Sequence, residues 1–224
     1  MEKPTIDYRQ FRLSKLNTDE FRHLLYLLYW PIYGLFFLFV ERFYQPSVWH
    51  SVSCSLDAKI PFNEWFVIPY IFWFVFLIGM LAYTALYDIE GFKKMSRFMM
   101  ITYTATIIIY LIYPNFQELR PTSFERDNLL TRFIAFIYVF DTNTNVCPSL
   151  HVVGSMAAMI AGLNSPRFQK AGWRIYFVVT AILTSISTVF LKQHSAVDVL
   201  AALPLCLMAY IICYLFGRRK IDVK

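Results

Sequence analysis

The chain has 224 residues, of which 58% are hydrophobic and 19% aromatic, and its formal net charge is +6. This composition excludes a soluble globular domain, because several apolar runs reach the ~20 residues that a helix needs to cross a bilayer. The positive charge does not indicate a nucleic-acid partner, since the basic residues follow the loops between the apolar runs.

The apolar runs predict an all-α membrane protein with six transmembrane helices in one bundle, so that residues 1–224 form a single domain. Residues 1–23 are a polar segment without the pattern of a cleavable signal peptide, and residues 217–224 are a basic tail. The six predicted spans are, in chain order, residues 24–40, 64–87, 99–113, 149–163, 173–191 and 195–216.

Two segments between the spans carry their own predictions. Residues 88–98 read as a short basic turn. Residues 114–147 form the longest non-spanning segment, and residues 129–140 within it are apolar but too few to cross a bilayer. We therefore expect a short helix within this segment, lying in the membrane interface.

The distribution of basic residues predicts the orientation. Six spans place both termini on one side of the membrane. Of the 21 Lys and Arg residues, that side receives all except Arg42, Lys59, Arg120, Arg126, Arg132 and Lys192. The positive-inside rule then makes the termini cytoplasmic and turns residues 114–147 outward. We expect an integral protein of the plasma membrane with its site on the extracytoplasmic side.

The run Cys147-Pro148-Ser149-Leu150-His151 reads as the beginning of a helix. Ser149 is a suitable N-cap, and a helix N-terminus is a natural seat for phosphate because of its free N–H groups and its dipole. His151 stands within the first turn. The alternative is a capped membrane helix with an incidental histidine.

A second polar cluster lies at the start of the sixth predicted span. His194 and Asp198 are four residues apart, which places them on one helical face. A carboxylate there fixes the imidazole tautomer and leaves the other ring nitrogen free to attack an electrophile. The alternative is a buried pair that only ties helices together.

These clusters combine into a predicted phosphate-ester site. His194 would attack phosphorus and His151 would protonate the departing alkoxide, while Arg120 and Ser149 bind phosphate oxygens. The scheme needs no metal and no cofactor. Zinc bound by His151, His194 and Asp198 is the alternative, against which a nearby arginine and an anion site at a helix end both argue.

At these residues the sequence resembles the type 2 phosphatidic acid phosphatase superfamily of membrane lipid phosphatases, sphingolipid-synthase-like phosphotransferases and vanadium-dependent haloperoxidases. The first family motif is Lys, six residues, then Arg-Pro. Arg120-Pro121 matches it, with Tyr113 in the lysine position. The second motif, Pro-Ser-Gly-His, matches residues 148–151 with Leu150 in place of glycine.

The third family motif is Ser-Arg, five residues, His, three residues, Asp. Ser187, His194 and Asp198 match it, and Thr188 replaces the arginine. Two of the family's three phosphate-binding cations are therefore missing from their places. Lys192 is one candidate to replace them, and Arg126 is another.

The resemblance implies that His194 forms a phosphohistidine, that Asp198 orients it and that His151 is the general acid. It also implies that Arg120 and Ser149 bind the phosphate. The expected function is therefore a membrane phosphohydrolase that cleaves phosphate esters of lipids at the outer leaflet.

The missing cations leave a lipid phosphotransferase as the alternative activity, and a non-enzymatic lipid transporter is the alternative from another class. The expected partners are a lipid phosphate and the bilayer, whereas the head group and the oligomeric state stay open. Cys54 and Cys147 both fall on the outer side, where a disulfide between them is an open question.

Overall fold

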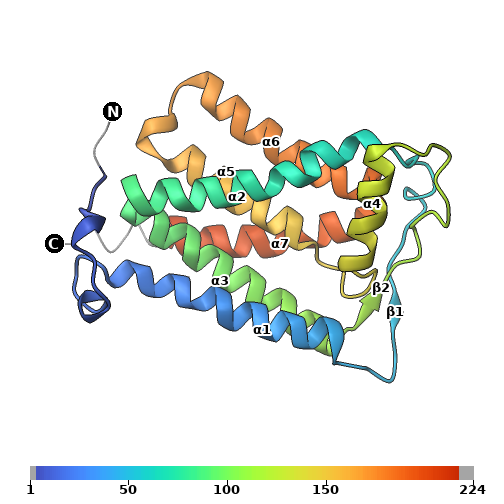
Figure 1. Ribbon diagram of the computed structural model, residues 1–224, viewed down its shortest axis with the longest axis horizontal. Helices are drawn as coiled ribbons and strands as arrows, with labels where there is room; N and C mark the ends of the chain where they lie inside the picture. Colours follow the sequence, from blue (N-terminus) through green and yellow to red (C-terminus); the bar gives the residue numbers. More distant parts are fainter. Residues whose placement is uncertain (1–3, 217–224) are drawn as a thin grey trace.

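The computed structural model describes residues 4–216, which are mostly helical (Figure 1). Its α-helices are α1 (Tyr29–Arg42), α2 (Val67–Tyr87), α3 (Ile89–Ile112), α4 (Leu129–Phe140), α5 (Leu150–Asn164), α6 (Ala171–Phe190) and α7 (Ala196–Tyr210). Shorter helical turns cover Tyr8–Gln10, Leu13–Lys15, Arg22–Leu28, Glu64–Phe66, Pro166–Phe168 and Ile211–Leu215. The predicted basic tail at 217–224 lies outside the described residues.

Five helices in the described part of the chain are long and apolar enough to cross a membrane. They are Arg22–Arg42, Glu64–Tyr87, Ile89–Ile112, Ala171–Phe190 and Ala196–Leu215. This pattern fits an integral membrane protein. The remaining predicted span, residues 149–163, corresponds to α5, which has only 15 residues.

The predicted turn at residues 88–98 is wrong, because α3 already begins at Ile89 and Asp88 alone separates it from α2. The Asp88 side chain accepts a hydrogen bond from the backbone N–H of Gly91 at 2.9 Å, which caps the first turn of α3. Lys93 pairs with Glu90 on the helix surface. These charged residues lie in the first turns of a helix, although so many charges in a short segment are also typical of a loop.

Helix α5 lies in the middle of the protein and packs against α2, α3, α6 and α7. Small residues allow this close packing. A Cβ atom on Gly162 would lie 2.4 Å from the ring of Phe177. Helix α1 is peripheral instead: it packs mainly against α3 and the preceding turn, and Val40 is its single fully buried residue.

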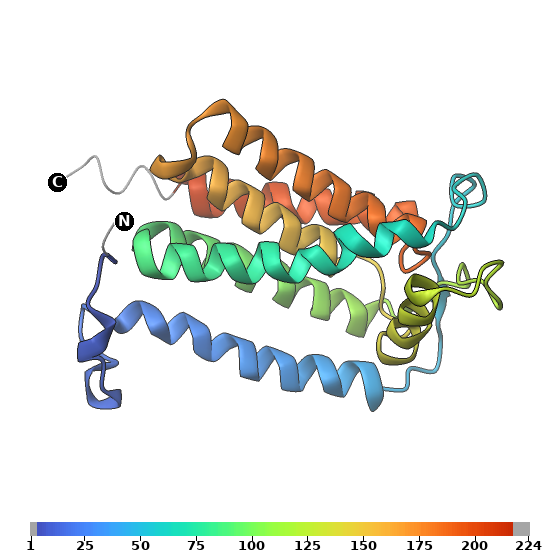
Figure 2. The same ribbon diagram turned by 45° about the horizontal axis from the view of Figure 1, so that its top comes forward.

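The long helices run side by side, and α4 lies across one end of them, as Figures 1 and 2 show. We call this the loop end, because the connections before α2 and α5 also gather there. There β1 (His50–Ser51) pairs in parallel with β2 (Asn115–Phe116), which joins two loops far apart in sequence. Both ends of the described chain lie at the opposite, terminus end.

Candidate functional site

The two predicted histidines meet at the loop end. His151 lies in the first turn of α5, and His194 comes two residues before α7 begins. Their ring centroids are 5.8 Å apart, although 43 positions separate them in the numbering. The fold thus brings together the two residues to which the sequence assigned the chemistry.

His194 is oriented by a carboxylate. Its Nδ1 lies 3.1 Å from Oδ2 of Asp198, and the backbone N–H of Ser195 donates to the same oxygen at 2.9 Å. The Asp198 side chain is fully buried. A carboxylate that accepts from Nδ1–H leaves the lone pair on Nε2, and no described residue hydrogen-bonds to that nitrogen.

His151 is held differently. No described residue makes a hydrogen bond with its ring. Instead the imidazole packs at a tilt against the rings of Tyr70 and Trp73, with ring centroids 4.5 Å and 4.6 Å away. These contacts restrain the ring and leave both nitrogens available for proton transfer.

Asp57, from the loop before α2, clamps the beginning of α7. Its Oδ1 accepts from the backbone N–H of Ala196 at 2.8 Å. Its Oδ2 accepts from the hydroxyl of Ser195 at 2.6 Å and from the N–H of Cys54 at 2.7 Å. Burial alone would raise the pKa of Asp57, but these hydrogen bonds outweigh burial and hold the pKa below its ordinary value.

Asn115 fixes the loop that leads into α5. Its side-chain oxygen accepts from the N–H groups of Val146 and Cys147 at 2.9 Å and 2.8 Å. Its amide nitrogen donates to the carbonyl of Cys147 at 2.9 Å. The Tyr110 hydroxyl adds a bond to the carbonyl of Pro148 at 2.8 Å.

Ser149 connects the two helix beginnings. Its backbone N–H donates to the carbonyl of Asp198 at 3.1 Å. Its hydroxyl accepts from the N–H of Val152 at 3.5 Å, which is the cap that the sequence predicted, at the limit of a hydrogen bond. The side chain is fully buried beside the His194–Asp198 pair.

Arg120 lies close to the histidines but is engaged with the protein. Its guanidinium donates to the carbonyls of Tyr138 and Thr142 at 3.0 Å and 2.7 Å, and also to the side-chain oxygen of Gln193. It stacks 4.5 Å over the Tyr138 ring. Burial lowers the pKa of Arg120, and the nearby Asp141 opposes that shift. Both terminal nitrogens of the guanidinium are therefore engaged, whereas Nε is buried without a partner among the described residues. A direct phosphate contact through the terminal nitrogens, as predicted for Arg120, requires exchange of these bonds.

Lys192 is directed away from the histidines. Its φ of 56° places it in the left-handed region, in the turn between α6 and α7. Its ammonium group donates to the carbonyl of Asp57 at 2.8 Å and to that of Ile60. Burial lowers the pKa of Lys192, although Asp57 opposes this effect. Arg126 pairs with Glu64 at 3.3 Å, so neither candidate cation reaches the histidines in this arrangement.

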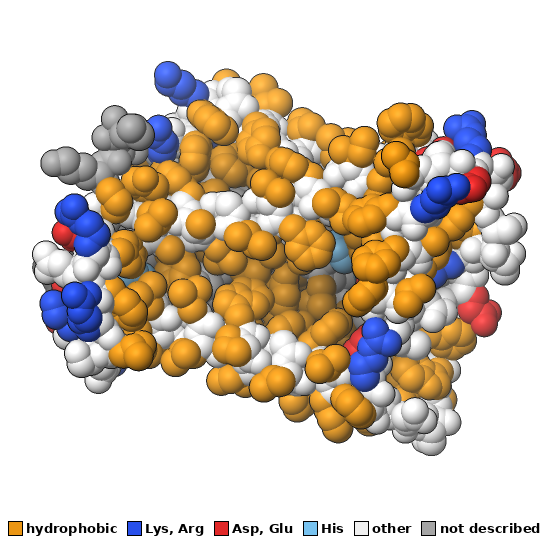
Figure 3. All heavy atoms as spheres, viewed as in Figure 1, with side chains coloured by type: hydrophobic (Ala, Val, Ile, Leu, Met, Phe, Trp, Pro, Cys, Tyr) orange, Lys and Arg blue, Asp and Glu red, His pale blue; other side chains and the backbone are white. Residues whose placement is uncertain are grey.

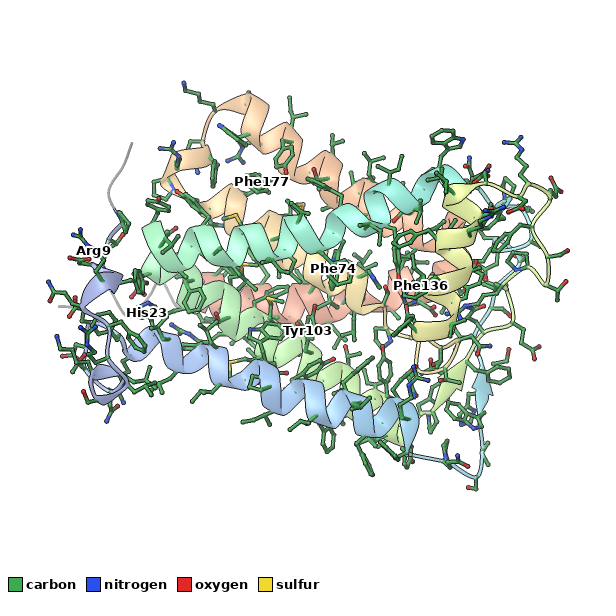
Figure 4. All side chains as sticks on the ribbon, in the orientation of Figure 1. Arg9, His23, Phe74, Tyr103, Phe136 and Phe177 are labelled. Atoms are coloured by element: carbon green, nitrogen blue, oxygen red, sulfur yellow. The ribbon has the colours of Figure 1, made fainter. Side chains whose placement is uncertain are left out.

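The histidines open into a cavity of about 400 Å³ lined by α1, α2, α3 and α4. Figure 3 shows the apolar face hollowed between α1 and α2, with a histidine surface inside the hollow. Phe74 of α2 and Phe136 of α4 both line the cavity, and Phe136 lies nearer to the loop end (Figure 4). Among described residues, no Lys or Arg lines the cavity, whereas the carboxylates of Glu41 and Asp141 do.

The sequence analysis missed Asp57, Asn115 and Gln193 as parts of this site. Each is a polar residue in a predicted loop, where hydration would be the ordinary expectation. Their partners are distant in sequence: the bond between Asp57 and Ser195 spans 138 positions. A buried role was not visible from local pattern alone.

The cysteine question receives a plain answer, since Cys54 and Cys147 are both free. Burial and the neighbouring Asp198 raise the pKa of the Cys147 thiol to about 12. Within residues 4–216, no group of three His, Cys, Asp or Glu residues is placed to hold a metal ion.

No family model matches the chain, and no curated protein or solved structure matches it either. The chemistry of the site therefore rests on its own geometry.

Proposed function

We propose that this protein is a membrane enzyme that cleaves phosphate esters of lipids through a phosphohistidine on His194. One observation carries the proposal: His194 is bonded to the buried Asp198, and its ring centroid lies 5.8 Å from that of His151 at the edge of one cavity. A transporter needs a path and a binding charge, but not a carboxylate behind a histidine. The motifs shared with the type 2 phosphatidic acid phosphatase superfamily agree, and we propose membership of it.

The proposed reaction divides the work between the histidines. Nε2 of His194 attacks phosphorus, which forms an N–P bond and breaks the P–O bond to the lipid alcohol. His151 in its protonated form gives its proton to the departing alkoxide. A water molecule then attacks phosphorus and passes a proton to His151, which forms a P–O bond and breaks the N–P bond to His194, so that phosphate leaves. Asp198 supports the positive charge on the His194 ring in both steps.

We further propose six membrane passages, with α5 as the short central one, cytoplasmic termini and an outward-facing site in the plasma membrane. Both ends of the described chain lie at the same end of the protein, which supports an even number of passages. Single cysteines at Thr122 and at Lys94 test the orientation with an impermeant thiol reagent in intact cells. Labelling at 122 alone is expected, and labelling at 94 alone would invert the orientation.

The second candidate is a phosphotransferase, in which a lipid hydroxyl replaces water in the second step. The acidic lining of the cavity favours it, because Glu41 and Asp141 repel a doubly charged phosphate monoester more than a singly charged phosphodiester. A diester substrate would leave a head group or phosphoryl group on His194 for an acceptor lipid.

The deciding experiment offers the purified protein phosphatidate, lysophosphatidate, polyprenyl pyrophosphate and phosphodiester lipids, with and without an acceptor lipid. Phosphate release without an acceptor indicates the hydrolase, and an acceptor-dependent lipid product indicates the transferase. Near-normal turnover in a folded His194→Ala variant would overturn both, and lipid movement without turnover would identify the transporter.

A further inference from the structure

Three polar aromatic side chains line the cavity beyond the histidines, toward the terminus end. They are Tyr33 of α1, Trp73 of α2 and Tyr103 of α3. The two hydroxyls and the indole nitrogen are buried, and none of them has a hydrogen-bond partner among the described residues. The proposed chemistry uses none of these three groups.

The three groups converge beside α5. The rings of Tyr33 and Tyr103 lie 5.2 Å apart. A Cβ atom placed on Gly154 would lie 3.0 Å from the indole nitrogen of Trp73 and equally far from the Tyr103 hydroxyl. Those two atoms are therefore no more than twice that distance apart, and the absence of a side chain on Gly154 lets both of them approach α5.

The cluster lies about one helical turn from His151, toward the terminus end. Gly154 follows His151 by three positions, which is ~4.5 Å along a helix axis. The Trp73 ring also contacts the ring of His151, so the cluster and the proposed acid share one wall of the cavity. Figure 4 shows Tyr103 further from the loop end than Phe136.

All three groups donate hydrogen bonds, and a hydrocarbon surrounding offers them no water. A ligand that accepts hydrogen bonds from these groups must carry acceptor oxygens about one helical turn from its phosphate, toward the terminus end. In an acylated lipid phosphate, the first carbonyl oxygens beyond the phosphate ester are those of the acyl linkages, which a dialkyl ether lipid lacks. A polyprenyl phosphate has only hydrocarbon at that depth.

We propose that Tyr33, Trp73 and Tyr103 form a subsite for the carbonyl oxygens of ester-linked or amide-linked acyl chains. The subsite selects acylated lipid phosphates against polyprenyl phosphates. This inference rests on the proposed function only for the position of the phosphate at the histidines.

The test measures binding rather than turnover. Native mass spectrometry of the full chain compares non-cleavable phosphonate analogues that differ only in their chains: diacyl ester, ceramide amide and dialkyl ether. The parent should hold the diacyl and ceramide analogues about tenfold tighter than the dialkyl analogue, the value of one or two hydrogen bonds. Tyr103→Phe should reduce that ratio toward one without weakening the dialkyl analogue.

Tyr214→Phe is the matched control, because its hydroxyl is also buried without a partner in the described chain but does not line the cavity. The control should keep the parent ratio. Tyr33→Phe and Trp73→Phe provide the same test if Tyr103→Phe fails to fold. Equal binding of all three analogues by the parent would overturn the subsite, as would a ratio unchanged in every cavity variant. Selective binding without any turnover would contradict the enzyme and leave the subsite standing.

Discussion

The site is built from two helix beginnings that are held in opposite ways. At α7, the first turn receives the carboxylates of Asp57 and Asp198 and the hydroxyl of Ser195. At α5, the cap is a single long contact to Ser149, and the His151 ring is placed by aromatic contacts alone. The difference corresponds to the proposed roles, because a nucleophile must be held in one tautomer, whereas a general acid needs a ring nitrogen that is free of protein partners.

The largest expected effect separates the two histidines. His194→Ala should abolish turnover, because the attacking nitrogen is removed. His151→Ala should slow cleavage of alkyl esters about 10²–10⁴-fold, the usual contribution of a general acid, yet still allow a phosphoenzyme from a substrate with a good leaving group. Trapping acid-labile phosphate on the protein after mixing with an aryl phosphate measures this. Phosphate trapped on the His194→Ala variant would contradict the assignment of His194 as the nucleophile.

Asp198→Asn should reduce turnover less than His194→Ala, since it removes orientation and charge support but leaves the attacking atom. The steady-state rate constant of the purified variant is the measurement, and Asp127→Asn, at an exposed ion pair, is the matched control. Parent-like activity in Asp198→Asn would make the buried pair purely structural.

The clamp on α7 should contribute to stability. Asp57→Ala removes an acceptor that serves three donors, and a hydrogen bond to a charged group contributes about 1.5–3 kcal/mol. We expect the free energy of unfolding to fall by at least that amount, as measured by circular dichroism in detergent. Asp127→Ala, in an exposed loop pair, should show no measurable change. If Asp57→Ala had the same free energy of unfolding as the parent, the hydrogen bonds of Asp57 would not stabilise the beginning of α7.

Asp57 should also produce a pH dependence of known sign. Its pKa is lowered in the folded protein, so its stabilisation is complete above the ordinary aspartate value of about 3.9 and is lost as pH falls through the lowered pKa. Between about pH 5 and about pH 2, the free energy of unfolding should therefore fall more steeply for the parent than for Asp57→Ala. Parallel curves would contradict the assignment.

The smallest effect belongs to the cap of α5. Ser149→Ala keeps the backbone bond to Asp198 and loses only the 3.5 Å contact, so we expect a cost of about 0.5–1 kcal/mol. Ser195→Ala at α7 should cost more, because it also loses the bond to Asp57. If the two variants unfolded at the same temperature, the beginnings of α5 and α7 would be held equally strongly, against our interpretation.

The sequence predicted the positions of the helices far better than the contacts of the cationic side chains. Residues 64–87 and 129–140 match the observed helices at both ends, because their length and hydropathy are local properties. The convergence of His151 and His194 also followed from where the apolar runs begin. The turn at 88–98 failed because a helix beginning and a loop carry similar polar residues.

The destinations of the cationic side chains could not be predicted in this way. Arg120 is bonded to Gln193 across 73 positions, and Lys192 turns away because of one left-handed backbone angle. Neither property is encoded in a motif, since each depends on which carbonyls the finished fold leaves unpaired. The same limit applies to Asp57, whose partners exist only after α7 has been placed.

For the enzyme proposed above, the hollow between α1 and α2 predicts a particular kinetic behaviour. A substrate that enters sideways from the leaflet meets the protein by two-dimensional diffusion, so its effective concentration is a mole fraction among neighbouring lipids. Diluting that lipid with an inert one, at constant amount per volume of solution, should therefore slow the reaction. The rate then follows the composition of the surface and not the volume of the suspension.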